Sequence, residues 1–79
     1  MKVKIKTWET LEKEFGLDEE GDINCSFFFT KDMEEELPAD RIIEVEPRID
    51  LIDGRKYLFE NDISLWWVSD DMIEQIIEE

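Results

Sequence analysis

Residues 64–76 read SLWWVSDDMIEQI, and they join an apolar, aromatic segment to an acidic one. The segment up to Val68 is rich in residues favoured in β-strands, and Ser69 stands where a helix N-cap is expected. The two aspartates that follow would lie in the first helical turn, where carboxylates complement the helix dipole. Val68 would pack on Ile73 as a hydrophobic staple. This stretch therefore predicts a strand that leads directly into a helix.

The adjacent tryptophans, Trp66 and Trp67, must point to opposite faces of that strand, because side chains alternate along a strand. Ile63, Leu65 and Trp67 share one wholly apolar face, so we expect Trp67 to be buried. Trp66 shares the other face with Val68, on the side where the helix would pack. We expect Trp66 to be either covered by this helix or partly exposed next to the acidic turn.

The rest of the chain shows the same alternation of short strands and helices. Residues 2–6, KVKIK, alternate lysine with apolar residues, which is typical of a strand with one buried face. Thr7 and Gly16 bracket an apolar stripe at helical spacing and predict a helix over residues 8–15. Asp53-Gly54 is the strongest hairpin signal in the chain. Further strands are expected over residues 23–29, 41–46 (ended or bent by Pro47), 49–52, 55–60 and 63–68, with a second helix over 31–37 and a third after Ser69.

Length and element order together define a fold class. The 79 residues are enough for one domain, residues 1–79, and too few for two. Tight turns between successive strands favour antiparallel pairing. The sequence therefore predicts an α+β fold, with a small curved antiparallel sheet or partly closed barrel of five to six short strands and three short helices.

A short internal similarity relates residues 26–37, SFFFTKDMEEEL, to residues 65–76, LWWVSDDMIEQI. Both contain an aromatic pair, an apolar residue, Thr or Ser, and then Asp-Met. Duplication of a half-domain would explain this similarity. Convergence would also explain it, because a strand followed by a capped helix requires these residue types. Under either explanation, both segments are expected to be strands that lead into short helices.

The charge of the chain restricts its partners. There are 23 acidic and nine basic residues, and the net charge is −14. Such a negative field repels nucleic acid and anionic membranes and attracts basic protein surfaces. The same charge would also serve solubility alone. The single cysteine, Cys25, cannot form an intramolecular disulfide, and the sequence shows neither a signal peptide nor a membrane span, so we expect a cytoplasmic protein.

The chain lacks the residues that most catalytic sites and metal sites require. The absence of histidine excludes Ser-His-Asp and Cys-His catalysis, and one cysteine is too few for a zinc site. The acidic stretch 18–24, DEEGDIN, alternates oxygen-bearing residues but departs from the EF-hand pattern, so we interpret it as a turn. We therefore expect no catalytic residues, no metal and no cofactor. A carboxylate-dependent hydrolase is the weakest alternative.

Acidic residues concentrate on the faces of the second and third predicted helices. Carboxylates three or four residues apart on a helix stand about 5–6 Å apart along one face. Such a row can imitate the charge density of a nucleic-acid backbone and occupy a basic groove on another protein. The candidate partner-binding residues are Asp32, Glu35, Glu36, Trp66, Asp70, Asp71 and Glu74.

Three segments of the chain, KVKIKTWETLEKEFGLDEEGDIN, FFFTKDMEEELP and VSDDMIE, carry a resemblance to known proteins. Through them the chain resembles a group of small acidic proteins encoded by phages and prophages, a group with no assigned activity. The resemblance covers more than half of the chain. It implies an accessory or counter-defence role, and it brings no functional residues with it.

These observations lead to two hypotheses on function. The first is a non-enzymatic, phage-derived acidic binding protein that engages a basic, nucleic-acid-binding surface of a host protein, as an inhibitor or nucleic-acid mimic. Its partner would be that host protein, without direct contact to nucleic acid or membrane. The alternative is a structural or assembly module that self-associates, as a homodimer, through its aromatic residues.

Overall fold

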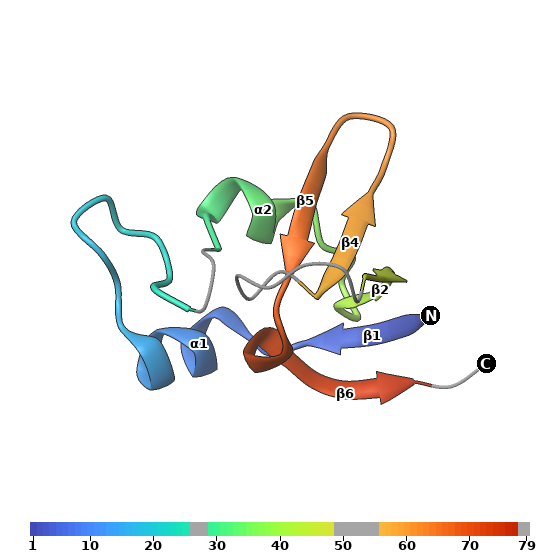
Figure 1. Ribbon diagram of the computed structural model, residues 1–79. Helices are drawn as coiled ribbons and strands as arrows, with labels where there is room; N and C mark the ends of the chain where they lie inside the picture. Colours follow the sequence, from blue (N-terminus) through green and yellow to red (C-terminus); the bar gives the residue numbers. More distant parts are fainter. Residues whose placement is uncertain (26–28, 49–55, 78–79) are drawn as a thin grey trace.

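The computed structural model describes residues 1–25, 29–48 and 56–77 (Figure 1). Within these ranges the chain forms two antiparallel sheets of three strands each and two α-helices. The α+β class and the antiparallel pairing are thereby confirmed, but the strands do not form a closed barrel. The elements are β1 (Lys2–Ile5), α1 (Trp8–Phe15), α2 (Lys31–Glu35), β2 (Ile42–Glu44), β3 (Glu46–Pro47), β4 (Tyr57–Glu60), β5 (Leu65–Val68), the 3₁₀ turn η1 (Asp70–Met72) and β6 (Ile73–Ile77).

The first sheet has β1 at its centre, with β2 on one side and β6 on the other. Val3 and Ile5 are fully buried, while the lysines that alternate with them lie on the opposite face. Val3 lies opposite Ile43 of β2 and Ile76 of β6. The alternation of lysine with apolar residues therefore correctly predicted both this strand and its buried face.

The second sheet has β4 at its centre, between β3 and β5. Phe59 of β4 lies directly opposite Trp66 of β5, and their ring centroids are 4.6 Å apart. Val68, two residues after Trp66, is fully buried on the same face. Aromatic and β-branched cross-strand pairs of this kind stabilise a sheet beyond the area that they bury.

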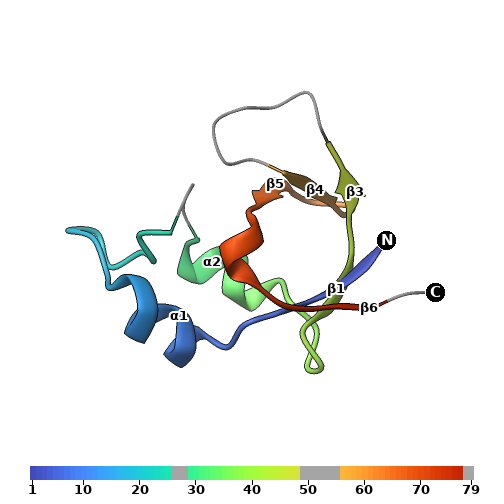
Figure 2. The same cartoon turned by 60° about the horizontal axis from the view of Figure 1, so that its bottom comes forward.

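The two sheets are continuous along the chain at two places. At the first, the chain passes from β2 to β3 through Val45, whose N–H donates to the carbonyl of Met1 at 2.7 Å. The amino group of Met1 donates in return to the carbonyl of Val45 at 3.2 Å. At the second, η1 connects β5 to β6. The strands thus surround a common interior (Figure 2).

Both described helices begin at the threonines that the sequence predicts. The Thr7 hydroxyl accepts the N–H of Thr10 at 3.2 Å, and α1 ends at Gly16, whose φ of 78° suits glycine. The Thr30 hydroxyl accepts the N–H of Met33 at 3.2 Å. The second helix ends at Glu35, two residues before the end of the predicted range 31–37. One buried residue from each helix, Leu11 and Met33, anchors it to the core.

The predicted third helix is wrong. Residues 70–72 form one 3₁₀ turn, and residues 73–77 form β6, which pairs with β1. Ser69 does not cap a helix; its hydroxyl instead donates to the carboxylate of Asp71. Ile73 is extended, with φ −91° and ψ 123°, so the staple between Val68 and a helical Ile73 does not exist. Pairing with the open edge of β1 satisfies more backbone groups than a short uncapped helix would.

Three other strand predictions are corrected or lie outside the described residues. In the range 23–29, Ile23 makes isolated bridges to Leu17 and Phe29, Asn24 and Cys25 belong to no strand, and residues 26–28 lie outside the described residues. The strand predicted over residues 41–46 is interrupted at Val45, and β3 ends at Pro47, as the sequence predicts. The hairpin at Asp53-Gly54 and the strand over 49–52 lie outside the described residues.

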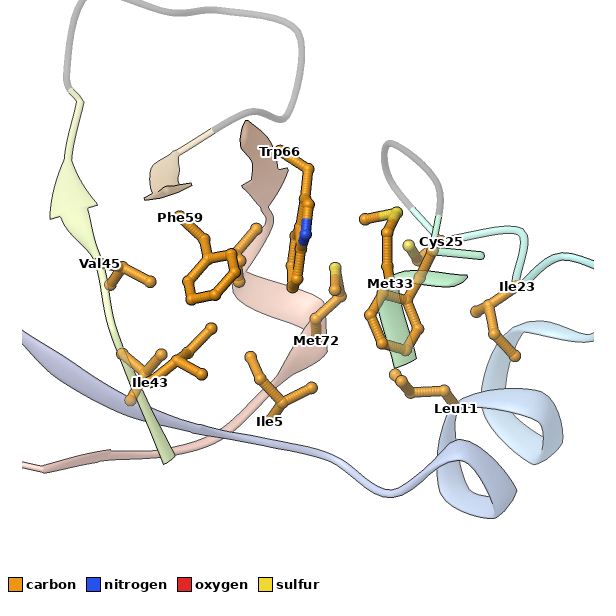
Figure 3. Packing of buried hydrophobic residues seen from close by; sticks show 13 residues of the cluster. Ile5, Leu11, Ile23, Cys25, Met33, Ile43, Val45, Phe59, Trp66 and Met72 are labelled. Atoms are coloured by element: carbon orange, nitrogen blue, oxygen red, sulfur yellow. The ribbon is translucent and has the colours of Figure 1, made fainter. Parts of the chain in front are cut away.

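The core is one continuous cluster that draws on every described helix and on both sheets. A chain of aromatic rings runs through it: Trp8 to Phe29 at 5.8 Å, Phe29 to Trp66 at 6.0 Å, and Trp66 to Phe59. Figure 3 shows Phe59, Trp66 and Met33 projecting into this space above Ile5 and Leu11. The aromatic chain thus connects α1 to the second sheet.

Arg41 joins three parts of the chain through its side chain. Its Nε donates to the carbonyl of Ile5 at 3.1 Å, and one terminal nitrogen donates to the carbonyl of Lys6. Both terminal nitrogens contact the carboxylate of Glu34, one of them at 2.9 Å. The fork geometry of a guanidinium allows all of these bonds at once. Arg41 therefore ties the end of β1 to α2, although its own backbone is left-handed, with φ 61°.

We expect the variant Arg41→Ala to lower the free energy of unfolding by about 2–4 kcal/mol, because it leaves a mostly buried carboxylate and two carbonyls without a donor. Arg41→Lys should also destabilise the protein, since an ammonium cannot form the fork. The measurement is urea denaturation followed by tryptophan fluorescence. Lys56→Ala, which removes an exposed ion pair, is the control and should cost much less; equal losses in the two alanine variants would contradict this role.

Candidate functional site

Trp66, a predicted partner-binding residue, lies in the core. Its side chain is only 7% exposed, whereas Trp67 is half-buried. The predicted buried face was therefore wrong: Ile63 is 83% exposed and Leu65 is 55% exposed. The pairing of β5 with β4 decides the face, because Trp66 lies opposite Phe59 and contacts Phe29 from the other side. Trp66 therefore packs within the core cluster.

Glu36, the residue after α2, holds the indole of Trp66. Its carboxylate accepts the Trp66 indole N–H at 3.4 Å and the side-chain amide of Asn61 at 3.1 Å, together with the Ser64 hydroxyl. Desolvation raises the pKa of Glu36, but these three hydrogen bonds outweigh it and lower the pKa below its ordinary value of 4.5. Glu36 thus links α2 to the β4–β5 turn.

Asp70 and Asp71 both bind within the chain. Asp70 accepts from the ammonium of Lys56 at 2.6 Å, which raises the pKa of Lys56. Partial burial and the charge of Asp70, with a hydrogen bond to it, raise the pKa of Tyr57. Asp71 accepts the hydroxyl of Ser69, which is itself buried. The side chains of Asp70 and Asp71 therefore make contacts within the chain and link η1 to the second sheet.

The other three predicted acidic residues lie on two elements, α2 and β6. Glu74 of β6 pairs with Lys4 of β1 at 3.3 Å. Asp32 and Glu35 are exposed on α2, and neither makes an ion pair with another described residue. Since residues 70–77 are not a helix, the carboxylates of Asp70 and Glu74 do not form a helical row. Of the predicted set, Asp32 and Glu35 face solvent without an ion-pair partner in the part of the chain that the structure describes.

The acidic turn at residues 18–24 and Cys25 have structural explanations. One carboxylate oxygen of Asp18 accepts the N–H groups of Glu20, at 2.8 Å, and of Asp22, at 3.0 Å. This arrangement closes the turn through a side chain that mimics a backbone carbonyl. Cys25 is buried in the core cluster. Within the described ranges, no cluster of Cys, Asp or Glu is arranged to hold a metal ion.

A concave surface that sequence reasoning missed lies where the chain passes from the first sheet to the second. This corner hollow has a volume of about 370 Å³ and is lined by Met1, Glu44, Val45, Glu46, Pro47, Leu58 and Glu60. Alternation alone places Glu44 with Glu46, and Leu58 with Glu60, on common strand faces. It cannot show that the two pairs meet, because the antiparallel register Glu46–Leu58 depends on tertiary pairing.

Comparisons with protein-family models, with curated proteins and with solved structures found no match to this chain. Neither of the helices in the described ranges has the length and apolar character needed to cross a membrane. The proposed function therefore rests on the arrangement of the chain's own residues.

We expect Trp66→Ala to lower the free energy of unfolding by about 3–5 kcal/mol, because it empties the centre of the aromatic chain. Trp67→Ala should cost clearly less, since Trp67 is half-buried and packs under Arg48. Should Trp66→Ala fail to fold, Trp66→Phe keeps a ring but loses the bond to Glu36 and gives a smaller, measurable loss. Urea denaturation measures all three; a larger loss for Trp67→Ala would contradict the assigned faces.

The lowered pKa of Glu36 has a consequence for stability. Ionised Glu36 stabilises the folded state at pH values above its ordinary pKa of 4.5, and this contribution is lost as the pH falls through the lowered folded value. Wild-type protein should therefore exceed Glu36→Gln in unfolding free energy at neutral pH, and the difference should disappear in acid. Urea denaturation of both proteins between pH 7 and pH 3 measures this difference, and a difference that persists in acid would contradict it.

Proposed function

We propose that this protein is a non-enzymatic acidic binding protein, of phage or prophage origin, that engages a basic, nucleic-acid-binding surface of a host protein. It would act as an inhibitor or nucleic-acid mimic. The observation that supports this proposal is that most basic side chains of the described residues make contacts within the chain, while carboxylates remain in excess. The net charge is −14, and the basic side chains of the described residues are largely engaged within the chain.

Several basic residues of the described ranges contact a carboxylate or an aromatic ring of the chain. Lys4, Lys6, Arg41 and Lys56 each contact a carboxylate of the chain. Lys31 lies over the ring of Trp8, 4.1 Å from its centroid. Each of the four ion pairs uses one carboxylate for one cation, so these contacts leave the net negative charge unchanged. The carboxylates in excess, including Asp32 and Glu35 at i and i+3 on α2, face solvent and favour a cationic partner.

The proposal predicts binding that is electrostatic and competes with nucleic acid. Immobilised protein should retain a basic nucleic-acid-binding protein from an extract of its natural host at about 50 mM salt and release it at about 500 mM salt, because screening shortens the range of charge interactions. Duplex DNA should also displace the retained protein. An immobilised, unrelated protein of equal net charge is the control. Retention that is independent of salt, or equal on the control, would contradict the proposal.

A second candidate function is self-association as an assembly module. The observation that favours it is the exposure of Ile63 and Leu65, at 83% and 55%. Self-association through aromatic side chains has less support, because Trp66 is buried. Sedimentation equilibrium distinguishes the two candidates: a stable dimer favours self-association, and a monomer favours the acidic binding protein.

A further inference from the structure

The corner hollow combines an apolar floor with carboxylates at its rim. Pro47 and Leu58 contribute apolar surface, and Glu44, Glu46 and Glu60 are exposed around them. Its volume of about 370 Å³ falls at the lower end of the range of ligand pockets, and it is open to solvent. Such a hollow suits a single long side chain with an apolar stem better than it suits a large ligand.

Among the described residues, one of the three glutamates that line the hollow makes an ion pair. The amino group of Met1 lies 3.4 Å from the carboxylate of Glu44. Neither Glu46 nor Glu60 makes an ion pair with another of the described residues. Two carboxylates at the rim are therefore available to a cation. Lysine and arginine fit this chemistry, because their apolar stems can cover Leu58 while the charged head reaches the rim.

The apolar surface continues beyond the hollow onto the outer face of the second sheet. Leu65 of β5 lies directly opposite Glu60, and Trp67, which packs under Arg48, lies directly opposite Leu58. Leu65 is 55% exposed. An apolar side chain placed next to the basic one would therefore find a contact on the same face. The hollow and this strip together match a segment in which basic and apolar residues are close neighbours.

We infer that the corner hollow docks a segment of a partner protein that contains neighbouring basic and apolar residues. This inference rests on the proposed function and specifies where the basic partner binds. The basic head would lie between Glu46 and Glu60, and the apolar neighbour would pack on Leu65. A second copy of this chain fits less well, because two molecules of net charge −14 would bring carboxylates to an already acidic rim.

The hollow lies away from α1. In both ribbon views α1 lies at the opposite end of the molecule from Met1 and the β3–β4 pair (Figures 1 and 2). This separation provides a matched control. Glu9 and Glu12 of α1 are exposed carboxylates, and their removal changes the net charge by the same amount as removal of Glu46 and Glu60.

The test is titration of the protein with a synthetic, end-capped peptide of arginine and leucine, about eight residues long, at low salt. Amide shifts in NMR spectra should map to β3, β4 and β5. The double variant Glu46→Gln and Glu60→Gln should bind about tenfold more weakly, as expected for two lost charge contacts. The control variant Glu9→Gln and Glu12→Gln should bind as the wild type does. Urea denaturation of each variant confirms that it is folded.

Two outcomes would overturn the docking site. Equal weakening by both double variants would show that only net charge matters, and this would leave the proposed acidic binding function standing. Equal affinity for a peptide with serine in place of leucine would show that the apolar floor takes no part. Failure of the proposed function is recognised separately, by wild-type binding to its host partner that does not respond to salt.

Discussion

The guanidinium of Arg41 bonds at once to the carbonyls of Ile5 and Lys6, where β1 ends, and to the carboxylate of Glu34 on α2. These groups come from distant parts of the chain, and they need a donor because they are largely removed from water. With α2 held in this way, Met33 enters the core and Glu36 reaches the indole of Trp66. The position of Trp66, and with it the inner face of the second sheet, therefore depends on the contact made by Arg41.

The aromatic chain from Trp8 to Phe59 compensates for the small size of the molecule. A chain of this length buries a modest fraction of its surface, so large side chains must supply much of the core. Phe29 occupies the middle of the chain and contacts both Trp8 and Trp66. Because one aromatic cluster joins α1 to the second sheet, neither part has a separate core of its own.

The distribution of charge relates the fold to the proposed function. Acidic residues outnumber basic ones by 14, and mutual repulsion of the excess would oppose folding. The structure places cations where they stabilise it, as with Lys4 beside Glu74 and Lys56 beside Asp70. What is left at the surface is an excess of carboxylates, part of which borders the corner hollow. In the proposed function, a basic partner would offset this excess of negative charge.

Features that arise from neighbouring residues could be predicted from the sequence. Thr7 with Gly16, and Thr30, located the helices because caps act within one turn, and the alternation in residues 2–6 identified β1 and its buried face. Tertiary structure alone decided the fate of residues 70–77, which pair with the open edge of β1 instead of forming a helix. It also decided that Trp66 and not Trp67 is buried, and that Glu46 meets Leu58 at the corner hollow. Local propensity cannot resolve these features, because strand register and the choice of buried face depend on partners far away in the chain.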